Sequence, residues 1–189
     1  LVRTGLPAPM AKTLLIPEAW SKRPDVMPPA WRDMYAYCNS VMEPWDGPAA
    51  IAAFDGRWAV AGLDRNGLRP MRYSISGDDL LVAGSETGMA ALDPEAVIER
   101  GAISPGRLIA LDLQEGRFYR EGEILDHLAD QQPYGRWIRD MEDIETVVGP
   151  GPETALFERE DRARRQLAAG YSFESIQLVV DAMAADGKE

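Results

Sequence analysis

The sequence predicts an α+β fold in which a group of short strands lies between two helical segments. Three observations lead to this prediction. Residues 1–40 carry helical patterns that prolines interrupt, residues 49–119 hold short apolar runs separated by turns, and helical periodicity returns from residue 121. The runs Ala49–Ala53 and Trp58–Ala61 are almost continuous in small or apolar residues, which is typical of a sheet covered on both faces. Such a sheet needs packed layers on each side, and this chain offers few helices to supply them.

The composition is that of a folded, acidic protein. Of its 189 residues, 46 % are hydrophobic, which is enough for a packed core in one or two domains. The 20 Lys and Arg residues face 31 Asp and Glu residues, and the resulting net charge of −11 disfavours binding to nucleic acid. The apolar stretches are far shorter than the ~20 residues of a membrane span. We therefore expect a soluble, cytoplasmic protein that binds neither nucleic acid nor a membrane.

The helical segment before the strands is defined best over Pro29–Val41. Proline is well suited to the first turn of a helix, where its missing N–H is not needed. The apolar residues recur at helical spacing and predict one buried face. These residues are Trp31, Met34, Tyr35, Cys38 and Met42. The turn-rich stretch 43–48 then leads into the strands.

The first two strands are predicted to form a hairpin. Asp55-Gly56 separates the runs Ala49–Phe54 and Arg57–Leu63, and both of these turn positions favour a positive φ. Further strands are predicted with turns at Gly77–Asp79 and Gln114–Gly116. These strands are Arg69–Ile75, Leu80–Ala83, Arg107–Asp112 and Arg117–Tyr119.

The last third of the chain is predicted to be helical, with one interruption. A helix begins at Glu121, and the Gly-Pro pairs of Thr146–Pro152 predict a linker. A charged helix over Thr154–Ala169 should end at Gly170, and Ser172 should cap a second helix that runs to about Ala185. The charged helix carries its acidic and basic side chains four residues apart, which predicts a salt-bridged surface. These side chains are Glu158, Glu160, Asp161, Arg162, Arg164 and Arg165.

Few residues of this chain are candidates for chemistry. A single cysteine and a single histidine argue against a disulfide framework, a zinc site and a Cys-ligated iron–sulfur site. Cys38 lies on the apolar helix face, where we expect a small buried hydrophobe rather than a nucleophile. His127 follows Asp126 on the polar side of its helix, where a solvated surface histidine and a chemical role are both open. No glycine-rich phosphate-binding pattern is present in the sequence.

The most informative stretch is Gly62–Pro70. A strand ends there, the side chains of Asp64 and Asn66 can accept from the backbone amides that follow them, and Gly67 can supply a positive φ. Pro70 holds the residue before it in an extended conformation and starts the next strand. Arg65 and Arg69 beside an aspartate could bind an anion, but a structural turn is the commoner outcome of such a pattern.

This stretch also carries a family resemblance. Asp64-Arg65-Asn66-Gly67-Leu68-Arg69-Pro70, followed by Ser85-Glu86, resembles the later half of a class II (N-terminal nucleophile) glutamine amidotransferase domain. Other stretches resemble the large subunits of glutamate synthases. These are Leu15–Trp20, Met42–Ala50, Gly106–Leu108, Gln132–Gly135 and Arg164–Tyr171.

The resemblance implies a fold and a domain organisation. Domains of this family are four-layer αββα sandwiches, so the chain is expected to form part of one, followed by a helical linker segment. It implies that residues 1–145 are the C-terminal part of the amidotransferase domain, that 146–153 are a linker, and that 154–189 are the helical start of the glutamate synthase central domain.

The resemblance also implies the chemistry of a longer parent enzyme. The first residue of the family domain is a cysteine that attacks the amide of glutamine, with its own α-amino group as the base. Ammonia then reaches a second site, where 2-oxoglutarate, FMN and an iron–sulfur cluster complete the synthesis of glutamate. The small subunit or ferredoxin supplies the electrons, and the sequence does not distinguish these donors.

The resemblance assigns no catalytic, cofactor-binding or metal-binding residue to this chain. The family's catalytic stretches come early in the domain and are absent here, and Asn66-Gly67 matches the later structural turn rather than the oxyanion motif. The matching residues are therefore expected to be structural. They are Asp64, Arg65, Asn66, Gly67, Arg69, Pro70, Ser85 and Glu86.

Other interpretations remain open from the sequence alone. The chain could be the equivalent piece of another class II amidotransferase, of the asparagine synthetase or amidophosphoribosyltransferase type, or a non-catalytic interaction module with an acidic surface. It begins with Leu1 and ends abruptly after a helical pattern, which is expected of a segment of a longer protein or of a trimmed small protein.

Overall fold

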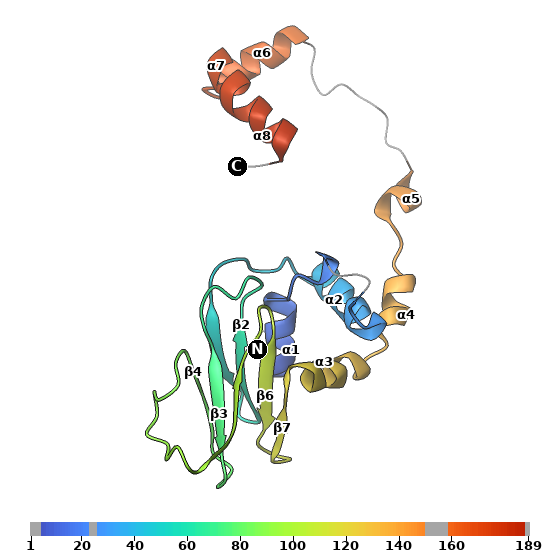
Figure 1. Cartoon of the computed structure of the whole chain (residues 1–189). Coiled ribbons are helices and arrows are strands. Elements are labelled where there is room, and N and C mark those ends of the chain that lie inside the picture. The colour runs from blue at the N-terminus through green and yellow to red at the C-terminus, as the bar shows by residue number, and fades with distance from the viewer. Residues whose placement is uncertain (1–4, 23–25, 150–158, 188–189) are drawn as a thin grey trace. The chain divides into compact units, whose positions relative to one another are not determined.

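The computed structural model describes residues 5–22, 26–149 and 159–187 (Figure 1). The chain divides into two compact units, Leu1–Met141 and Glu142–Glu189. The first unit contains the strands and the core, and the second unit is helical. Each unit is described by itself.

Two antiparallel sheets form the centre of the first unit. The larger sheet has the order β1-β2-β6-β7, and the smaller has the order β4-β3-β5. The larger sheet contains β1 (Ala50–Phe54), β2 (Trp58–Leu63), β6 (Leu108–Asp112) and β7 (Arg117–Tyr119). The smaller sheet contains β3 (Arg72–Ser76), β4 (Leu81–Gly84) and β5 (Val97–Ala102). All predicted strands are confirmed apart from small shifts at their ends, and β5 is a strand that the sequence did not predict.

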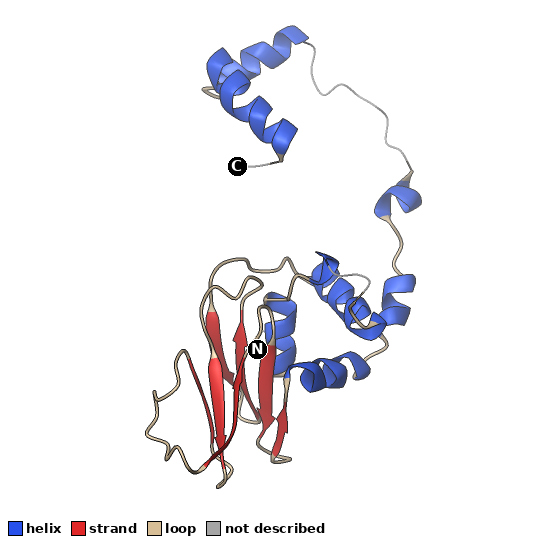
Figure 2. Ribbon diagram, viewed as in Figure 1, coloured by secondary structure: helices blue, strands red, loops and turns tan. Residues whose placement is uncertain are grey.

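The larger sheet is covered on both faces, as its composition predicted. Helices α1 (Ala8–Leu15), α2 (Pro29–Val41) and α3 (Glu121–Asp130) lie on one face, and the smaller sheet lies on the other (Figures 1 and 2). Alternate residues of β2 and β6 enter two different cores. Trp58, Val60, Leu108 and Ala110 pack among the helices, and Ala61, Leu63 and Ile109 pack with Met71 and Ile103 between the sheets.

Three layers of the expected sandwich are therefore present, in the order α, β, β. Within the described part of this unit, no helix lies over the outer face of the smaller sheet (Figure 2). The α+β class and the partial sandwich agree with the prediction, and the outer layer on that face is the one that this chain does not supply.

The helices of the first unit follow their sequence patterns. The apolar face predicted for α2 is confirmed, because Trp31, Met34, Tyr35 and Cys38 are buried. At the start of α3, the Glu123 carboxylate accepts from the backbone N–H of Arg120 at 2.8 Å. Two short helices, η1 (Trp20–Lys22) and α4 (Tyr134–Arg139), complete this layer, and α4 packs against α2.

The β1–β2 hairpin forms, but its turn differs from the prediction. Gly56 has a positive φ of 100°, whereas Asp55 does not have a positive φ. The Asp55 carboxylate instead accepts from the backbone N–H groups of Arg57 and Trp58 at 2.9 and 2.7 Å. The Asp55 N–H also donates to the Trp58 carbonyl at 3.2 Å, so side-chain and backbone hydrogen bonds together hold this turn.

The second unit contains α5 (Ile144–Val148), α6 (Arg159–Ala168), α7 (Phe173–Ser175), the π-helical turn η2 (Ile176–Val180) and α8 (Asp181–Asp186). Residues 146–148 of the predicted linker are helical, because they form the end of α5; Pro150–Pro152 and 154–158 lie outside the described residues. The Ser172 hydroxyl caps α7 by accepting from the Ser175 N–H, and Gly170 has a φ of 83°. Among the described residues, no helix is both long and apolar enough to cross a membrane.

Candidate functional site

The stretches that carry the family resemblance meet at one end of the larger sheet. The loop after α1, the turn before β1, the loop between β2 and β3, and the residues before β6 all converge there. We call this region the motif junction. It contains Lys12, Leu15, Glu18, Trp45, Asp46, Ala49, Asp64, Arg65, Asn66, Gly67, Arg69, Gly106 and Arg107.

Asp64 is the centre of the motif junction. Only 1 % of the residue is exposed, and its carboxylate accepts from the N–H groups of Ala49 and Asn66, each at 3.0 Å. Its backbone carbonyl accepts from the N–H groups of Gly67 and Gly106. Burial opposes the charge, but these N–H groups outweigh it and lower the pKa of Asp64. Through its carboxylate and its backbone carbonyl, Asp64 therefore joins its own loop to the residues before β1 and before β6, and each carboxylate oxygen accepts from a backbone N–H.

Gly67 is required by the way the junction closes. Its φ is 59°, in the left-handed region that favours glycine. A Cβ atom at this position would lie 2.8 Å from the Cγ and 2.9 Å from the Cα of Pro105. The loop between β2 and β3 can therefore lie against Pro105 only with glycine here.

Lys12 enters the junction from α1 and is buried. Its Nζ donates to the carbonyl oxygen of Gly106 at 2.6 Å, and the residue is 5 % exposed. Burial lowers the pKa of Lys12 to about 7, although the nearby carboxylate of Glu18 acts in the opposite direction. A large part of the Lys12 population is thus uncharged at neutral pH.

Glu18 and Arg107 form an ion pair on the same side of the junction. Arg107 Nη2 lies 3.1 Å from Glu18 Oε2, and the two side chains are 19 % and 7 % exposed. The Arg107 guanidinium lies 4.9 Å from the centre of the Trp31 ring, which ties the pair to α2. The other oxygen, Glu18 Oε1, is buried without a hydrogen-bond donor among the described residues.

The two arginines of the β2–β3 loop are both engaged. Arg65 makes an exposed ion pair with Asp46, and Arg69 Nε donates to the carbonyl of Pro48 at 3.4 Å. Of the two outcomes considered for this stretch, an anion site and a structural turn, these contacts favour the turn.

Ser85 and Glu86 lie apart from the other motif residues. Gly84 pairs with Arg72, so Ser85 and Glu86 follow β4 beside the start of β3. The Ser85 hydroxyl lies 3.4 Å from the sulfur of Met89, and Glu86 lines a separate cavity with Arg72. Within the described residues, no hydrogen bond or ion pair joins them to the motif junction.

Cys38 has the environment of a small hydrophobe. The residue is 1 % exposed, and burial raises the pKa of its thiol to about 12. The thiolate, which is the nucleophilic form, is therefore essentially absent at neutral pH. This position agrees with the prediction from the apolar face of α2.

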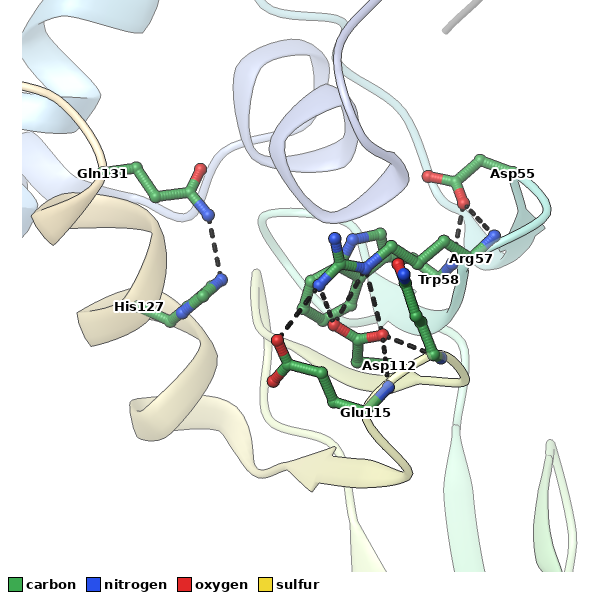
Figure 3. A network of polar contacts seen from close by, with 8 residues as sticks. Asp55, Arg57, Trp58, Asp112, Glu115, His127 and Gln131 are labelled. Atoms are coloured by element: carbon green, nitrogen blue, oxygen red, sulfur yellow. Dashed lines mark hydrogen bonds and ion pairs between the residues drawn. The ribbon is translucent and has the colours of Figure 1, made fainter.

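His127 is half-buried, so it is not the fully solvated residue that was one of its two open interpretations. Its ring lies 5.0 Å from the ring of Tyr119 and 5.7 Å from that of Trp58, and its Nε2 lies 2.9 Å from the side-chain nitrogen of Gln131 (Figure 3). Through the His127 ring, helix α3 packs onto Trp58 of β2 and Tyr119 of β7. These ring contacts indicate a packing role for His127.

Sequence reasoning missed a second polar network at the opposite end of the sheet. The guanidinium of Arg57 donates to both carboxylate oxygens of Asp112, which is fully buried (Figure 3). Asp112 also accepts from the N–H groups of Gln114 and Glu115, and these bonds, led by that from Arg57, lower the pKa of Asp112. Arg57 and Asp112 are 55 residues apart in the sequence, so only the fold brings them together. The network is fully satisfied and closes the β6–β7 turn.

The described residues do not form a metal site that we can identify. Within the described residues, no group of three or more His, Cys, Asp and Glu side chains could hold a metal ion. The sequence has one cysteine, whereas an iron–sulfur cluster is usually held by several. An iron–sulfur cluster therefore does not fit this segment.

The comparison with known families now defines the class. The family model for class II glutamine amidotransferases matches residues 1–137, and the chain belongs to this family. The layered α, β, β arrangement agrees with that assignment.

More particular similarities cover the whole chain. It is 45 % identical over 192 residues to the glutamate synthase [NADPH] large chain of Azospirillum brasilense, with 100 % of this chain and 13 % of that protein covered. It is 38 % identical over 192 residues to the chloroplastic ferredoxin-dependent glutamate synthase 2 of Arabidopsis thaliana, with 100 % and 12 % covered. The resemblance to glutamate synthase large subunits is confirmed, and the chain spans only about an eighth of the length of these relatives.

Proposed function

We propose that this chain is the later part of the amidotransferase domain of a glutamate synthase large subunit, with the start of the next domain attached. Residues 1–145 would complete the amidotransferase domain, 146–153 would link, and 154–189 would begin the central domain. The family match ends at residue 137 and the first compact unit at Met141, and both support a boundary near 145. The named relatives are glutamate synthases, which favours this enzyme over the asparagine synthetase and amidophosphoribosyltransferase alternatives.

In this proposal the parent enzyme hydrolyses glutamine and passes ammonia to 2-oxoglutarate for the reductive formation of glutamate. An N-terminal cysteine of the parent would attack the amide and its α-amino group would take the proton. The residues of this chain perform none of these steps. They build one helical layer and parts of both sheets, and the observation that carries the proposal is the whole-length similarity together with this partial sandwich.

The proposal places the cofactors and the redox partner outside this segment. FMN and an iron–sulfur cluster would bind elsewhere in the parent. The electrons would come from a small subunit or from ferredoxin, and the similar proteins named above include both NADPH and ferredoxin-dependent types. We further propose that the parent is cytoplasmic and binds neither nucleic acid nor a membrane.

The rest of the parent chain is the proposed partner of this segment. An apolar groove between the two sheets is open beside β1, where Phe54 is 61 % exposed. The groove is lined by Ala52, Phe54, Leu81, Ala83, Ile109 and Leu111. Covering apolar surface gains about 25 cal/mol per Å². We expect the first half of the domain to cover this groove and the outer face of the smaller sheet.

A reconstitution experiment tests the proposal. The first half of the domain, beginning with its cysteine, is produced together with this chain, and ammonia release from glutamine is measured. We expect activity from the pair and none from this chain alone. The Cys38→Ala variant should leave the activity of the pair unchanged, because this thiol is buried. Ammonia release by this chain alone that survives Cys38→Ala would reveal an overlooked nucleophile and contradict the proposal.

The neighbouring coding sequence provides an independent check. An FMN-binding barrel followed by clustered cysteines downstream would support a glutamate synthase. A nucleotide or phosphoribosyl site there would instead indicate another class II amidotransferase.

A further inference from the structure

The motif junction contains a peptide bond that is chemically labile. Asn66 and Gly67 form the only Asn-Gly pair of the sequence, and the one other asparagine, Asn39, precedes Ser40. An asparagine that precedes glycine is especially prone to spontaneous deamidation, because glycine has no side chain to shield its backbone nitrogen and restricts the backbone least. Asn66-Gly67 is therefore the position in this chain where deamidation is chemically easiest.

The reaction uses the backbone nitrogen of Gly67. This nitrogen attacks Cγ of the Asn66 side chain, a new N–C bond closes a succinimide ring, and the side-chain nitrogen leaves as ammonia together with the proton that Gly67 gives up. Water then opens the ring at either of its two carbonyl carbons. One opening yields aspartate, and the other yields isoaspartate, in which the main chain runs through the side-chain carbons.

The fold already engages the nitrogen that would attack. The Gly67 N–H donates to the backbone carbonyl of Asp64 at 3.1 Å, and the same carbonyl accepts from the Gly106 N–H at 2.7 Å. The N–H of Asn66 donates to the Asp64 carboxylate at 3.0 Å. The backbone N–H groups on both sides of the Asn66 side chain are thus tied to Asp64, and Gly67 can give up its proton only after its hydrogen bond breaks.

Packing holds Gly67 in the same place. Its φ of 59° and its close approach to Pro105, where even a Cβ atom would lie 2.8 Å from the proline Cγ, leave the glycine little room to move. Asn66 itself is exposed, so the fold does not keep water from its side chain. Any protection of this residue therefore comes from the held backbone rather than from burial.

The two products differ in whether the junction can close around them. Isoaspartate adds one atom to the main chain between Asp64 and Gly67. The Gly67 N–H is then displaced from the Asp64 carbonyl, and the glycine is displaced from its position against Pro105. Aspartate leaves the main chain unchanged and adds only a charge on an exposed side chain.

We propose that Asn66 is a site of spontaneous deamidation that the closed motif junction suppresses, and that its isoaspartyl product prevents the junction from closing again. The junction would then protect the chain from an irreversible change whenever it is folded. The proposal does not depend on the function proposed above or on what covers this segment in a longer protein, because every contact that it uses lies within the segment.

Deamidation rates test the first part. The 189-residue chain is incubated in mildly alkaline buffer with and without guanidinium chloride, digested at acidic pH, and analysed by liquid chromatography and mass spectrometry. Asn66 should react about 10-fold more slowly without denaturant, because hydrogen bonds of the junction must first break. In denaturant, Asn39 is the internal control and should react more slowly than Asn66, because a side chain follows it. Equal rates for Asn66 under the two conditions would overturn the proposal.

Refolding tests the second part. Chains that have reacted in denaturant are returned to buffer, and the compact fraction is separated by size-exclusion chromatography. Isoaspartate at position 66 should be depleted from this fraction relative to aspartate. The matched variant is Asn66→Asp, which adds the charge without the extra main-chain atom and should keep the urea midpoint of the unchanged chain. An undiminished share of isoaspartate in the compact fraction, or a large loss of stability in Asn66→Asp, would contradict the assigned role of the main chain.

Discussion

Lys12 shows how much a single buried charge shapes the motif junction. The side chain contributes one hydrogen bond, to Gly106, and in return its ammonium group is removed from water. Burial is therefore the main cause of its lowered pKa, and Glu18 compensates only in part. A proton on Lys12 destabilises the folded state relative to the unfolded chain.

This argument predicts a dependence of stability on pH. In the folded chain Lys12 loses its proton near pH 7, whereas an unfolded lysine keeps it until about pH 10.4. Between these values the unfolded chain binds more protons, so the unfolding free energy should rise by about 1 kcal/mol per pH unit. Urea unfolding between pH 7.0 and about 8.0 measures this rise. This range stays below the ordinary cysteine pKa of about 8.5, because an unfolded Cys38 thiol that lost its proton would lower the unfolding free energy.

The matched variant for this prediction is Lys12→Met. It retains the length of the apolar stem and removes the titrating group, so its unfolding free energy should be nearly constant over the same pH range. An equal rise in Lys12→Met would show that another group is responsible.

A second prediction concerns Asp112, whose charge is opposite to that of Lys12. Asp112→Asn leaves the Arg57 guanidinium without its carboxylate and should lower the unfolding free energy at pH 7 by about 1–3 kcal/mol. Because the folded pKa of Asp112 is lowered, its stabilisation is present above an unfolded pKa of about 3.9 and is lost as the pH falls below that value.

Thermal or urea unfolding of Asp112→Asn and Glu115→Gln provides the comparison. Glu115 is a more exposed partner of the same arginine, at 3.4 Å, so Glu115→Gln should change the unfolding free energy by less than about 0.5 kcal/mol. Equal losses in both variants would contradict the assignment of Asp112 as the main partner of Arg57.

At the scale of elements, the sequence predicted the features that depend on near neighbours. The apolar face of α2 and the turn around Asp64 follow from spacing and from local hydrogen bonds, and both are present. Strand β5 was missed because Glu99, Arg100 and Gly101 interrupt its apolar pattern, while its hydrogen bonds come from β3.

The contacts that complete the motif junction could not be predicted, for the same physical reason. Lys12 meets Gly106, and Glu18 meets Arg107, across most of the first unit. Nothing in the local pattern of α1 marks Lys12 as buried. Lys12 is buried only because residues from outside α1 pack around it.

The loop between β2 and β3 makes a prediction about glycine. Gly67→Ala should lower the unfolding free energy by more than Gly56→Ala, with a difference of at least about 1 kcal/mol. Both positions have a positive φ, but a Cβ at Gly67 would meet Pro105 whereas a Cβ at Gly56 would meet no atom within 4 Å. Urea unfolding of the two variants measures the difference, and equal losses would show that the close approach to Pro105 does not matter.

At the scale of the whole molecule, the two units differ in how they are held together. Residues of β2 and β6 are buried between layers, whereas none of the residues of α5, α7, η2 and α8 is buried. Their large apolar side chains include the exposed Phe173 and Leu178. The short helix α5 and the continuous helical run 173–186 formed by α7, η2 and α8 have little stability without packing.

Hydrogen exchange should reveal this difference directly. Amides of residues 173–186 should exchange far faster than amides of β6, because their helices open without disrupting a core. Mass spectrometry of peptides from the exchanged chain provides the measurement, and α2 is the control for a helix that is packed. Equal protection of α8 and β6 would contradict the prediction.

The edge of the larger sheet has a consequence for the synthesis of such a domain. Strand β1 is an edge strand, and its five residues, Ala50–Phe54, include neither a charged residue nor a proline. Exposed edge strands of natural proteins usually carry a charged residue or a proline, because otherwise a neighbouring molecule can add its own strand to the sheet. If a cell synthesised this segment by itself, the segment would be prone to aggregation. This is a physical reason for keeping both halves of the sandwich on one polypeptide.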